Sequence, residues 1–358
     1  MAAQPLVSVI VAARDADATL AAALQSALAQ SHRRFEIIVV DDGSTDATAE
    51  IAREFARRDK RVRLMQGRGA GVSAARNVAL AVASGRYVAP LDADDLWHPA
   101  KLERQVAAAE GAAEPPGFVY CWLRHIDGEG RVTGSGPRDD FHGCIAHRHL
   151  YKCAGAAGGT ALIRRDAMTA IGGYDERLDR CEDFFLQLRI ASRHPVTVVP
   201  EYLLGYRGVP GSLSRDRDTV LRNWRLLRML SRQSCPGITH RFDRWMYARQ
   251  FYQAAEARLV ARAWLSGFGL LLKAALRDPP WTFGSAWLRL SSMLDRRPAP
   301  VPGPAFLAID PRERLGPEPM TERAAAFWLR WLDTKRMAKL ARRDAAYASR
   351  SFPRRRCG

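Results

Sequence analysis

Val7-Ser-Val-Ile-Val-Ala-Ala13 and Phe35-Glu-Ile-Ile-Val-Val40 are the first two apolar runs of the chain. Both are rich in β-branched residues and nearly free of polar ones, which is typical of strands buried on both faces of a parallel sheet. Between them, leucines recur at every fourth position over residues 18–30, as in a helix. The order strand, helix, strand predicts a right-handed parallel crossover, and a helical pattern at 47–57 extends it into a doubly wound α/β sheet.

Carboxylates follow two of the predicted strands directly. Asp41 and Asp42 end the second run, and Gly85-Arg-Tyr-Val-Ala-Pro-Leu-Asp-Ala-Asp-Asp95 ends in Asp92, Asp94 and a third aspartate. Ligands of doubly wound sheets bind at the carboxyl ends of the strands. Because residues alternate faces along an extended chain, Asp92 and Asp94 point the same way and suit one hard cation, Mn²⁺ or Mg²⁺. The alternative is a solvated acidic turn, since Asp-x-Asp is short and common.

A glycine-bearing loop lies between the two acidic clusters. The stretch Gly67-Arg-Gly-Ala-Gly-Val-Ser-Ala-Ala-Arg-Asn77 opens a predicted helix, whose N-terminus can attract an anion, and Arg76 adds a positive charge. The glycine spacing does not match a dinucleotide-binding fingerprint, and the Lys-Ser/Thr pair of a phosphate loop is absent. The loop is therefore either an anion-binding element or a plain helix start.

Together, these motifs resemble those of family 2 glycosyltransferases. The resemblance is carried by Val9-Ile-Val-Ala-Ala13, Ile38-Val-Val-Asp-Asp-Gly-Ser-Thr-Asp46, Gly71-Val-Ser-Ala-Ala-Arg-Asn77, Leu91-Asp-Ala-Asp-Asp95, Ile171-Gly-Gly-Tyr-Asp-Glu176 and Glu182-Asp183. It covers roughly residues 5 to 216. The resemblance implies a GT-A fold, which is a doubly wound mixed sheet with helices on both faces. It also implies an inverting enzyme that transfers a sugar from a nucleoside diphosphate sugar to an acceptor hydroxyl.

The same resemblance implies roles for single residues. Asp42, with Asp41 as a weaker candidate, is expected to hold the base and ribose of the nucleotide. Ala13, at the end of the first strand, belongs to the same nucleotide-binding set, and Arg76 is expected to reach the base. These assignments place the nucleotide at the ends of the first two predicted strands.

The metal is expected at Asp94, beside Asp92, and is Mn²⁺ or Mg²⁺. Departure of a nucleoside diphosphate builds negative charge on phosphate oxygens, and a divalent cation stabilises that charge as a Lewis acid.

An inverting displacement also needs a base for the acceptor proton. Asp183 is the first candidate and Glu182 the second, and both lie in the first turn of a predicted helix. The alternative is that the pair only caps this helix.

A glycine-rich segment at 204–215 is predicted to form a lid. In the family a histidine of this segment can help at the metal, whereas Val209 stands in its place here. The resemblance therefore leaves a third protein ligand in doubt, with Arg207 and Arg215 as candidates to meet the phosphates.

Other residues carry weaker signals. The residues Cys144, His147, His149 and Cys153 are of zinc-binding types, but their spacing matches no known zinc pattern, and a polar acceptor loop is the favoured interpretation. Trp97 and Lys101 are expected to shape the donor-sugar pocket, and Trp122 is either a sugar platform or, with more weight, a core or rim residue. The six cysteines form no Cys-x-x-Cys pair, which fits a reducing compartment.

Charge is distributed unevenly along the 358 residues. Residues 216–358 hold 28 Lys and Arg against 12 Asp and Glu, whereas residues 1–215 are close to neutral. We therefore predict a catalytic GT-A domain at 1–215, an α-helical C-terminal region at 216–297, and a Pro-rich linker with a basic helical tail at 298–358. The helical region is either a cap packed on the catalytic domain or an attachment to an anionic membrane surface.

No run is long enough to span a bilayer, because the most apolar one, at 264–276, falls short of the roughly 20 residues required. No signal peptide is apparent, so the expected location is cytoplasmic, with peripheral attachment to the inner face of the cell membrane as an option. Aromatic and leucine side chains among arginines would form the lipid-facing part: Trp281, Phe283, Trp287 and Leu288 with Arg277, Arg289, Arg296 and Arg297.

The expected partners are a nucleoside diphosphate sugar and a glycan or lipid-linked acceptor, in the synthesis of a bacterial surface glycan. Two alternatives remain. The basic region could bind nucleic acid, although no recognition motif accompanies it. The chain could also be a glycosyltransferase-like protein without activity, against which Asp42, Asp92, Asp94 and Asp183 argue.

Overall fold

The computed structural model describes residues 4–152, 157–178, 180–208, 217–235, 237–238, 243–294, 303–313 and 322–351. Two compact units make up the chain. The sheet unit comprises Met1–Cys144, Ala154–Ser212 and Pro302–Glu313, and the helical unit comprises Ile145–Cys153, Leu213–Val301 and Arg314–Gly358. The predicted α-helical C-terminal region is thus confirmed.

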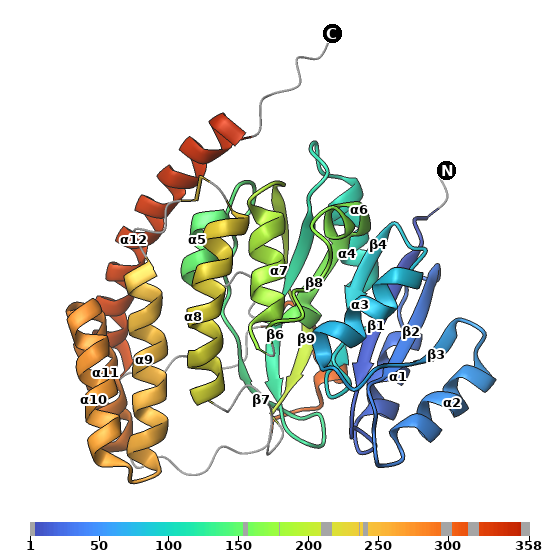
Figure 1. The fold of residues 1–358 in the computed structure, drawn as a ribbon, viewed down its shortest axis with the longest axis horizontal. Coiled ribbons are helices and arrows are strands. Elements are labelled where there is room, and N and C mark those ends of the chain that lie inside the picture. Colours follow the sequence, from blue (N-terminus) through green and yellow to red (C-terminus); the bar gives the residue numbers. More distant parts are fainter. Residues whose placement is uncertain are drawn as a thin grey trace. The chain divides into compact units, whose positions relative to one another are not determined.

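The sheet unit alternates strands and helices along its first half (Figure 1). Its strands are β1 (Val7–Ala13), β2 (Phe35–Asp41), β3 (Val62–Gln66), β4 (Tyr87–Pro90), β5 (Leu96–Trp97), β6 (Phe118–Ile126), β7 (Val132–Ser135), β8 (Ala161–Arg164) and β9 (Val196–Arg207). Its helices are α1 (Leu20–Leu28), α2 (Thr48–Arg58), α3 (Val72–Val82), α4 (Lys101–Glu110), α6 (Arg165–Thr169) and α7 (Glu182–Ala191), with 3-10 turns η1 (Gly158–Thr160) and η4 (Phe306–Ala308).

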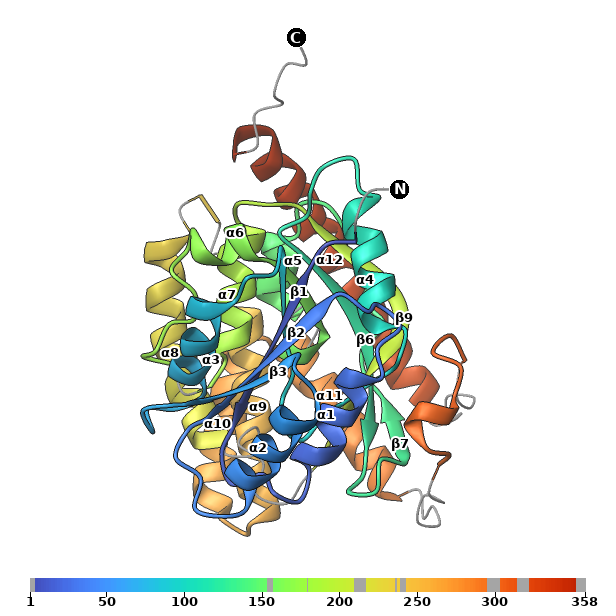
Figure 2. The ribbon, with the colours of Figure 1, turned by 90° about the vertical axis from the view of Figure 1, so that its right-hand side faces the viewer.

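One mixed sheet runs in the order β3-β2-β1-β4-β8-β6-β9-β5, with β7 paired to β6. Strand β1 is parallel to both β2 and β4, and Figure 2 shows β1 and β2 side by side. Strand β8 then pairs antiparallel with β4 and with β6. The register places Ala13 opposite Asp41, so the carboxyl ends of β1 and β2 lie at the same edge. The predicted doubly wound mixed sheet is therefore confirmed.

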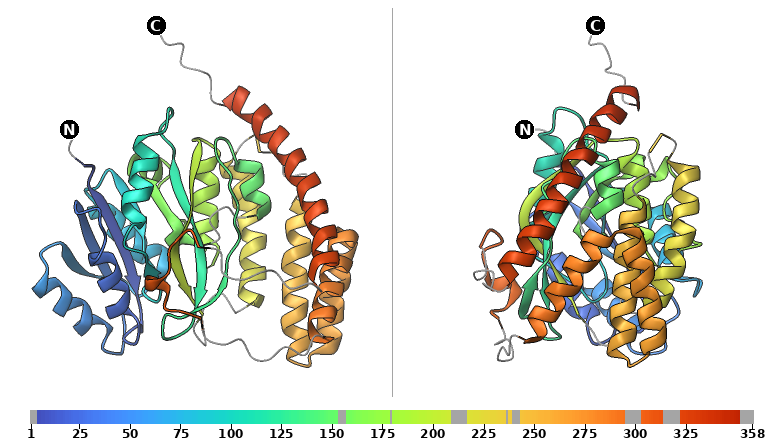
Figure 3. Two further views of the ribbon diagram at one scale, coloured as in Figure 1. Left: turned by 180° about the vertical axis from the view of Figure 1, so that it is seen from behind. Right: turned by 90° about the vertical axis from the view of Figure 1, so that its left-hand side faces the viewer.

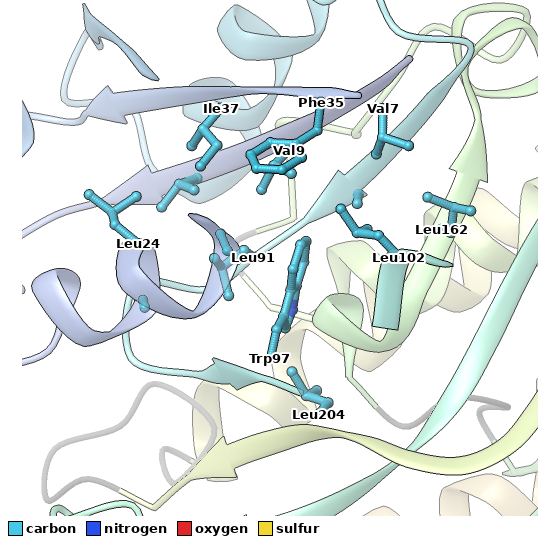
Figure 4. Packing of buried hydrophobic residues seen from close by; sticks show 14 of the residues in the cluster. Val7, Val9, Leu24, Phe35, Ile37, Leu91, Trp97, Leu102, Leu162 and Leu204 are labelled. Atoms are coloured by element: carbon cyan, nitrogen blue, oxygen red, sulfur yellow. The ribbon is translucent and has the colours of Figure 1, made fainter. Parts of the chain in front are cut away.

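Both faces of the sheet are buried. Val7 and Val9 pack with Leu24 of α1 and Leu102 of α4 on one face (Figure 4). The alternate residue Ile10 is also completely buried, and α3 lies against β1 and β2. This burial on both faces explains why the strands read as continuous apolar runs in the sequence.

The helical unit contains α8 (Arg217–Ser234), α9 (Asp243–Val260), α10 (Trp264–Arg277), α11 (Pro279–Leu294), α12 (Glu322–Ser351) and the short α5 (Ala146–Lys152) (Figure 3). Helix α9 packs on α10, and α12 packs on both α5 and α11. Tyr151 of α5, Trp245 of α9 and Leu340 of α12 form a shared apolar cluster. None of the helices in the described ranges is long and apolar enough to cross a membrane.

Two segments depart from the predicted domain boundaries. Helix α5 lies within the range predicted for the catalytic domain, yet its side chains pack among those of α9 and α12. Residues 303–313, here called the return segment, were expected to be linker and tail but belong to the sheet unit. Phe306 is 1% exposed and fills the space that the missing side chain of Gly205 leaves open. The return segment is therefore part of the core of the sheet unit.

Candidate active site

The first part of the site lies at the edge where β1 and β2 end. Ala13 is buried, and its carbonyl oxygen accepts a hydrogen bond from the backbone N–H of Asp42 at 2.9 Å. The carboxylate of Asp41 accepts a hydrogen bond from the backbone N–H of Ser44 at 3.1 Å. Ala13, Asp41 and Asp42 thus lie together, as the sequence predicted for a nucleotide site.

Asp42 holds the glycine loop that precedes α3. Its two carboxylate oxygens accept hydrogen bonds from the backbone N–H groups of Gly69, at 2.9 Å, and Gly71, at 2.7 Å. A side chain at Gly67 would lie 2.5 Å from the Asp42 carboxylate, and Gly69 and Gly71 have positive φ angles, so glycine is required at these places. Asp42 therefore fixes the loop that the sequence identified as a candidate anion-binding element.

The second part of the site is a cluster of three carboxylates around Arg76, here called the Arg76 cluster. Nη2 of Arg76 donates to Asp92 at 2.5 Å, and Nη1 donates to Glu182 at 2.9 Å and to Asp183 at 3.0 Å. The guanidinium also lies 5.1 Å from the ring centre of Tyr174. Three elements supply these groups: α3, the turn after β4 and the first turn of α7.

Arg76 was expected to reach the nucleotide base, but it lies in a different environment. Its side chain is 3% exposed, and both terminal nitrogens contact carboxylates that come from residues 92, 182 and 183. Burial opposes the charged form, yet Asp183, Asp92 and Glu182 together hold the pKa of Arg76 above its ordinary value. Arg76 is thus the central cation of the carboxylate cluster, which its sequence context did not reveal.

The two acidic residues of α7 differ in their titration. Burial, and then the charge of Asp183, raise the pKa of Glu182 to about 8. Burial also raises the pKa of Asp183, whereas the positive charge of Arg76 opposes this shift. The Asp183 side chain is 20% exposed and that of Glu182 is 12% exposed, so Asp183 is the more accessible of the two.

Gly158 makes room for Asp183. A Cβ atom at Gly158 would lie 2.3 Å from Cγ and Oδ2 of Asp183 and 2.4 Å from its Oδ1. Gly158 was not among the residues predicted from the sequence. The Gly158-Gly159 pair directly before a strand-like run was the available signal, because glycine beside a strand often marks a close backbone approach.

The third part of the site is the turn that carries Asp94 and Asp95. Burial, and then the negative charge of Asp92, raise the pKa of Asp94 to about 6. Burial and the charges of both neighbours raise the pKa of Asp95, which is fully buried, and its Oδ2 atom has no hydrogen-bond partner. Three carboxylates so close together destabilise one another, and a divalent cation would relieve this repulsion.

Arg207 stabilises this turn. Its backbone N–H donates to Asp95 Oδ1 at 2.9 Å, and its Nε donates to the carbonyl oxygen of Asp94 at 2.7 Å. Nη1 donates to the carbonyl oxygens of Asp127 and Gly128, and the residue is 4% exposed. This placement differs from the predicted contact with phosphates. Val209 and Arg215 lie outside the described residues.

Asp92 and Asp94 lie in a turn, in which the backbone N–H of Asp95 donates to the carbonyl oxygen of Asp92 at 3.1 Å, and not in the extended segment that the sequence predicted. Their carboxylate oxygens are still of the type that a hard divalent cation prefers. Asp92 uses one oxygen for Arg76, and Asp94 shows the raised pKa of an uncompensated carboxylate. No group of three or more His, Cys, Asp or Glu side chains with metal-binding geometry occurs among the described residues. The protein would thus supply two carboxylate ligands, and oxygens of the diphosphate and of water would complete the shell.

Two predicted sugar-pocket residues are buried instead. Trp97 and Lys101 have no exposed surface, and Lys101 Nζ lies 4.2 Å from the Trp97 ring centre and donates to Gln105 at 2.9 Å. Burial lowers the pKa of Lys101 to about 8. Trp122 donates from Nε1 to the carbonyl oxygen of Asp139 at 3.0 Å, as a rim residue does.

The cysteine and histidine constellation is not a metal site as far as it is described. His147 bonds to Asp344, with its backbone N–H at 2.7 Å and its Nδ1 at 3.1 Å from Oδ1. His149 is buried in the helical unit. Cys153 lies outside the described residues. His147 and His149 thus serve the packing of α5 in the helical unit.

Comparisons with known proteins identify the family. A family model described as "Glycosyl transferase family 2" matches residues 8–172. The chain is 32% identical over 219 residues to UDP-Glc:alpha-D-GlcNAc-diphosphoundecaprenol beta-1,3-glucosyltransferase WfaP of Escherichia coli. The aligned residues make up 59% of this chain and 81% of that protein. Other relatives are longer, and the chain spans 26% of a Rickettsia bellii protein named as an uncharacterized glycosyltransferase.

Solved structures agree on the fold. S. aureus TarS 1-349 in complex with UDP-GlcNAc has a TM-score of 0.56 at 19% identity, over 80% of each chain. The mannosyltransferase PcManGT from Pyrobaculum calidifontis, in complex with GDP-Man and Mn²⁺, has a TM-score of 0.53 at 18% identity, over 99% of this chain and 89% of that one. The sheet, the matched motifs and these similarities together show that the chain belongs to glycosyltransferase family 2 and has the GT-A fold.

Proposed function

We propose that this protein is an inverting glycosyltransferase that moves a sugar from a nucleoside diphosphate sugar to an acceptor hydroxyl. The observation that carries the proposal is the Arg76 cluster. Arg76 joins Asp92 of the candidate metal site to Asp183, the candidate base, although these residues lie 16 and 107 positions away in the chain. The contacts with Arg76 thus support the proposal, because they hold the proposed metal ligand and the proposed base close together.

Asp183 is the proposed base. It accepts the proton of the acceptor hydroxyl while the acceptor oxygen bonds to the anomeric carbon and the nucleoside diphosphate leaves from the opposite face. Burial raises the pKa of Asp183, and the positive charge of Arg76 opposes this shift and favours the ionised form that a base requires. Glu182, with a pKa of about 8, is largely protonated at neutral pH and so is the less suitable base.

Asp94 and Asp92 would hold Mn²⁺ or Mg²⁺. When bound, the cation would neutralise charge on the leaving diphosphate. Arg207 positions these ligands, because it bonds to the carbonyl of Asp94 and to the carboxylate of Asp95. We assign Arg207 to the support of this turn and not to direct contact with the phosphates.

The nucleotide is proposed to bind at the ends of β1 and β2. Ala13 and Asp41 lie opposite each other at the last paired positions of these strands, and Asp42 fixes the glycine loop before α3. Each oxygen of the Asp42 carboxylate accepts one backbone hydrogen bond and keeps a lone pair for a further donor, so Asp42 can also accept a hydrogen bond from a ribose hydroxyl or a base N–H.

A lipid-linked acceptor of a bacterial surface glycan is the proposed acceptor class. WfaP, by its name, acts on a diphosphoundecaprenol-linked sugar, and this chain covers 81% of that protein. The proposed location is cytoplasmic, with peripheral attachment to the inner face of the cell membrane. The positive charge of the C-terminal half is not by itself an argument for nucleic acid, and we do not propose that function.

A screen of UDP-Glc, UDP-GlcNAc and GDP-Man with and without Mn²⁺ tests the proposal. A donor that binds the folded protein at about 100 times its Kd should add about 2.7 kcal/mol of stability, visible as a higher Tm. Asp94→Asn should remove the dependence of this shift on Mn²⁺. Asp183→Asn should keep the shift and lower turnover by a factor on the order of 10² or more.

The exposed Asp140, on the loop after β7, offers the control Asp140→Asn, which makes the same chemical change away from the Arg76 cluster. Failure of every donor to bind, or full turnover by Asp183→Asn, would contradict the proposal. Turnover lost in Glu182→Gln and kept in Asp183→Asn would exchange the roles of the two acids.

A further inference from the structure

Exposed apolar side chains concentrate in one part of the helical unit. Among the described residues, eight of the twelve large hydrophobic side chains that are exposed lie between residues 260 and 287. They are Val260, Trp264, Leu265, Phe268, Leu272, Leu276, Phe283 and Trp287, with exposed fractions between 56% and 93%. Exposed apolar residues scattered singly need no explanation, whereas a contiguous group of this kind marks an interaction surface.

Helix α10 has two contrasting sides. Gly267 and Ala274 are buried, and a side chain at Gly267 would lie 2.7 Å from Leu259 of α9, so the small residues face that helix. The large residues lie opposite. At about 100° per residue, the exposed positions 264, 265, 268, 272 and 276 fall within an arc of about 120°. We call this arc the apolar stripe of α10.

A basic pocket adjoins the end of the stripe. Leu276 is the last residue of the stripe, and the next residue, Arg277, lines a pocket of about 340 Å³. Five cationic side chains and one carboxylate line this pocket: Arg244, Arg277, Lys335, Arg336, Lys339 and Asp278. The side chains of Trp245 and Leu332 form part of its apolar wall.

The single carboxylate of the pocket is neutralised within its wall. Asp278 is 2% exposed and bonds to Arg336 twice, at 2.6 Å to each terminal nitrogen. Arg336 is 5% exposed, and its Nε atom is buried without a hydrogen-bond partner. Because Asp278 is paired with Arg336 in this way, it does not offset the charges of Arg244, Arg277 and Lys335, and the pocket attracts an anion. Its volume accommodates a phosphate group.

We propose that the helical unit docks on an anionic phospholipid bilayer, with a headgroup phosphate in this basic pocket and the apolar stripe of α10 at the boundary between headgroups and acyl chains. Helices bound in this way have a large apolar face flanked by Lys and Arg and lie in the plane of the interface. Lys273 lies beside one edge of the stripe on α10, Arg277 follows the last residue of the stripe, and Trp264 and Trp287 are of the residue type enriched at this depth.

A second copy of the chain fits this surface less well. Pairing of two identical faces would bring Arg277, Lys335 and their neighbours close to the same cations of the other copy, and like charges repel. An anionic bilayer complements both features at once. The surface belongs to the helical unit and the Arg76 cluster to the sheet unit, so docking and sugar transfer can be tested separately.

Some of the residues that the sequence suggested as membrane-facing are exposed in the structure, and one of them is not. Trp281 is half-buried and packs edge-on against Tyr252, at 5.5 Å between ring centres, so it belongs to the interior of the helical unit. Phe283 and Trp287 are exposed as expected. The side chains of Leu288 and Arg289 and the whole of Arg296 and Arg297 lie outside the described part. The stripe of α10 lies in the most apolar run of the sequence but was not among the suggested lipid-facing residues, and it becomes the main apolar contact.

The test is co-sedimentation of the full chain with phosphatidylglycerol vesicles and with phosphatidylcholine vesicles, at low and high salt. Wild type should prefer phosphatidylglycerol, and high salt should reduce that preference. Phe268→Ser/Leu272→Ser should lower the partition coefficient on both vesicles by about tenfold or more. Arg277→Gln/Lys335→Gln should lower the preference for phosphatidylglycerol by about tenfold and leave binding to phosphatidylcholine unchanged.

Two matched controls belong to this experiment. Arg57→Gln/Arg58→Gln removes the same charge from exposed residues of α2, and Met229→Ser removes an exposed apolar side chain from α8. Both should bind vesicles as wild type does. Donor hydrolysis without vesicles should be equal in all variants, so a failure of docking is distinguishable from a failure of the proposed chemistry.

Equal sedimentation of wild type and both double variants would overturn the proposal. A second result would also overturn it: wild type forms a dimer and does not bind vesicles, and the Phe268→Ser/Leu272→Ser variant is a monomer. The stripe would then be the contact between two copies of the chain. Hydrogen exchange, measured on wild type with and without vesicles, tests the proposal without relying on the folding of any variant. Phosphatidylglycerol vesicles should protect peptides from α10 and α11, and protection elsewhere only would also overturn the docking surface.

Discussion

Replacement of Gly158 by alanine should impair turnover by displacing a single carboxylate. The new Cβ would lie 2.3 Å from Cγ and Oδ2 of Asp183, whereas ordinary contacts begin near 3.4 Å. The Asp183 carboxylate must therefore move by about 1 Å. Its hydrogen bond from Arg76, now 3.0 Å long, would be strained or lost.

The expected loss of kcat depends on which atoms move when the methyl group is added. All three atoms that the new methyl group meets belong to the far end of the Asp183 side chain, which can rotate, so the protein should still fold. Gly158 is not among the described residues with positive φ, so alanine can adopt its backbone conformation. A misplacement of about 1 Å in a reacting group can lower the rate by about 10²-fold, and we expect a loss of kcat of this order.

The neighbouring glycine provides a matched control. A Cβ at Gly159 would meet Leu204 at 3.4 Å and 3.5 Å and Asp95 Oδ2 at 3.6 Å, which are ordinary contacts. Gly159→Ala should therefore retain turnover within a small factor. The assay is release of nucleoside diphosphate from the donor found in the stability screen, with kcat and the donor KM measured for both variants. The donor KM of Gly158→Ala should be close to that of wild type. Equal activity of the two variants would refute the role of Asp183.

Two further predictions concern titration and the return segment. Because Glu182 has a pKa of about 8 in the folded protein against 4.5 in the unfolded chain, the folded state holds an extra proton between these pH values and its stability falls as pH rises. Glu182→Gln should flatten the dependence of Tm on pH in this window. The exposed control Glu114→Gln should leave that dependence as it is in wild type. An unchanged slope in Glu182→Gln would contradict the raised pKa. Phe306→Ala should destabilise the sheet unit by roughly 3–5 kcal/mol, because the side chain is fully buried, whereas truncation of the half-exposed Leu307 should have little effect. Thermal inactivation of donor turnover measures this difference, and equal behaviour of the two variants would mean that the return segment does not belong to the core.

Features that depend on local patterns were predicted from the sequence. Continuous β-branched runs indicated strands buried on both faces, and β1 and β2 begin and end close to the predicted positions. Helix α7 begins at Glu182, so the acidic pair lies in its first turn, as the spacing indicated. These outcomes follow because strand and helix periods are written in neighbouring residues.

Features that depend on tertiary contact were not predicted. Nothing near Arg76 indicates that it bonds to Glu182 and Asp183, which lie more than 100 positions later. Burial of Lys101 contradicts the usual behaviour of lysine, and it occurs because the Trp97 ring and Gln105 contact the ammonium group.

The return segment shows the same limit. Its proline-rich approach indicated a linker, yet Arg124 donates to the carbonyl oxygens of Asp310, at 3.2 Å, and Glu313, at 2.7 Å. The fully buried Phe306 adds apolar contacts. A deletion that tests the role of the basic tail should therefore begin after Glu313, since a deletion from residue 305 would also remove part of the core.

The stereochemistry of transfer tests the central claim most directly. Proton NMR can follow the sugar released from an α-linked nucleoside diphosphate donor in the presence of Mn²⁺, before the free sugar equilibrates between anomers. The single displacement assisted by Asp183 predicts that the β anomer appears first, and that Asp183→Asn slows its appearance by a factor on the order of 10². First appearance of the α anomer, or release that Asp183→Asn leaves unchanged, would contradict the proposed mechanism.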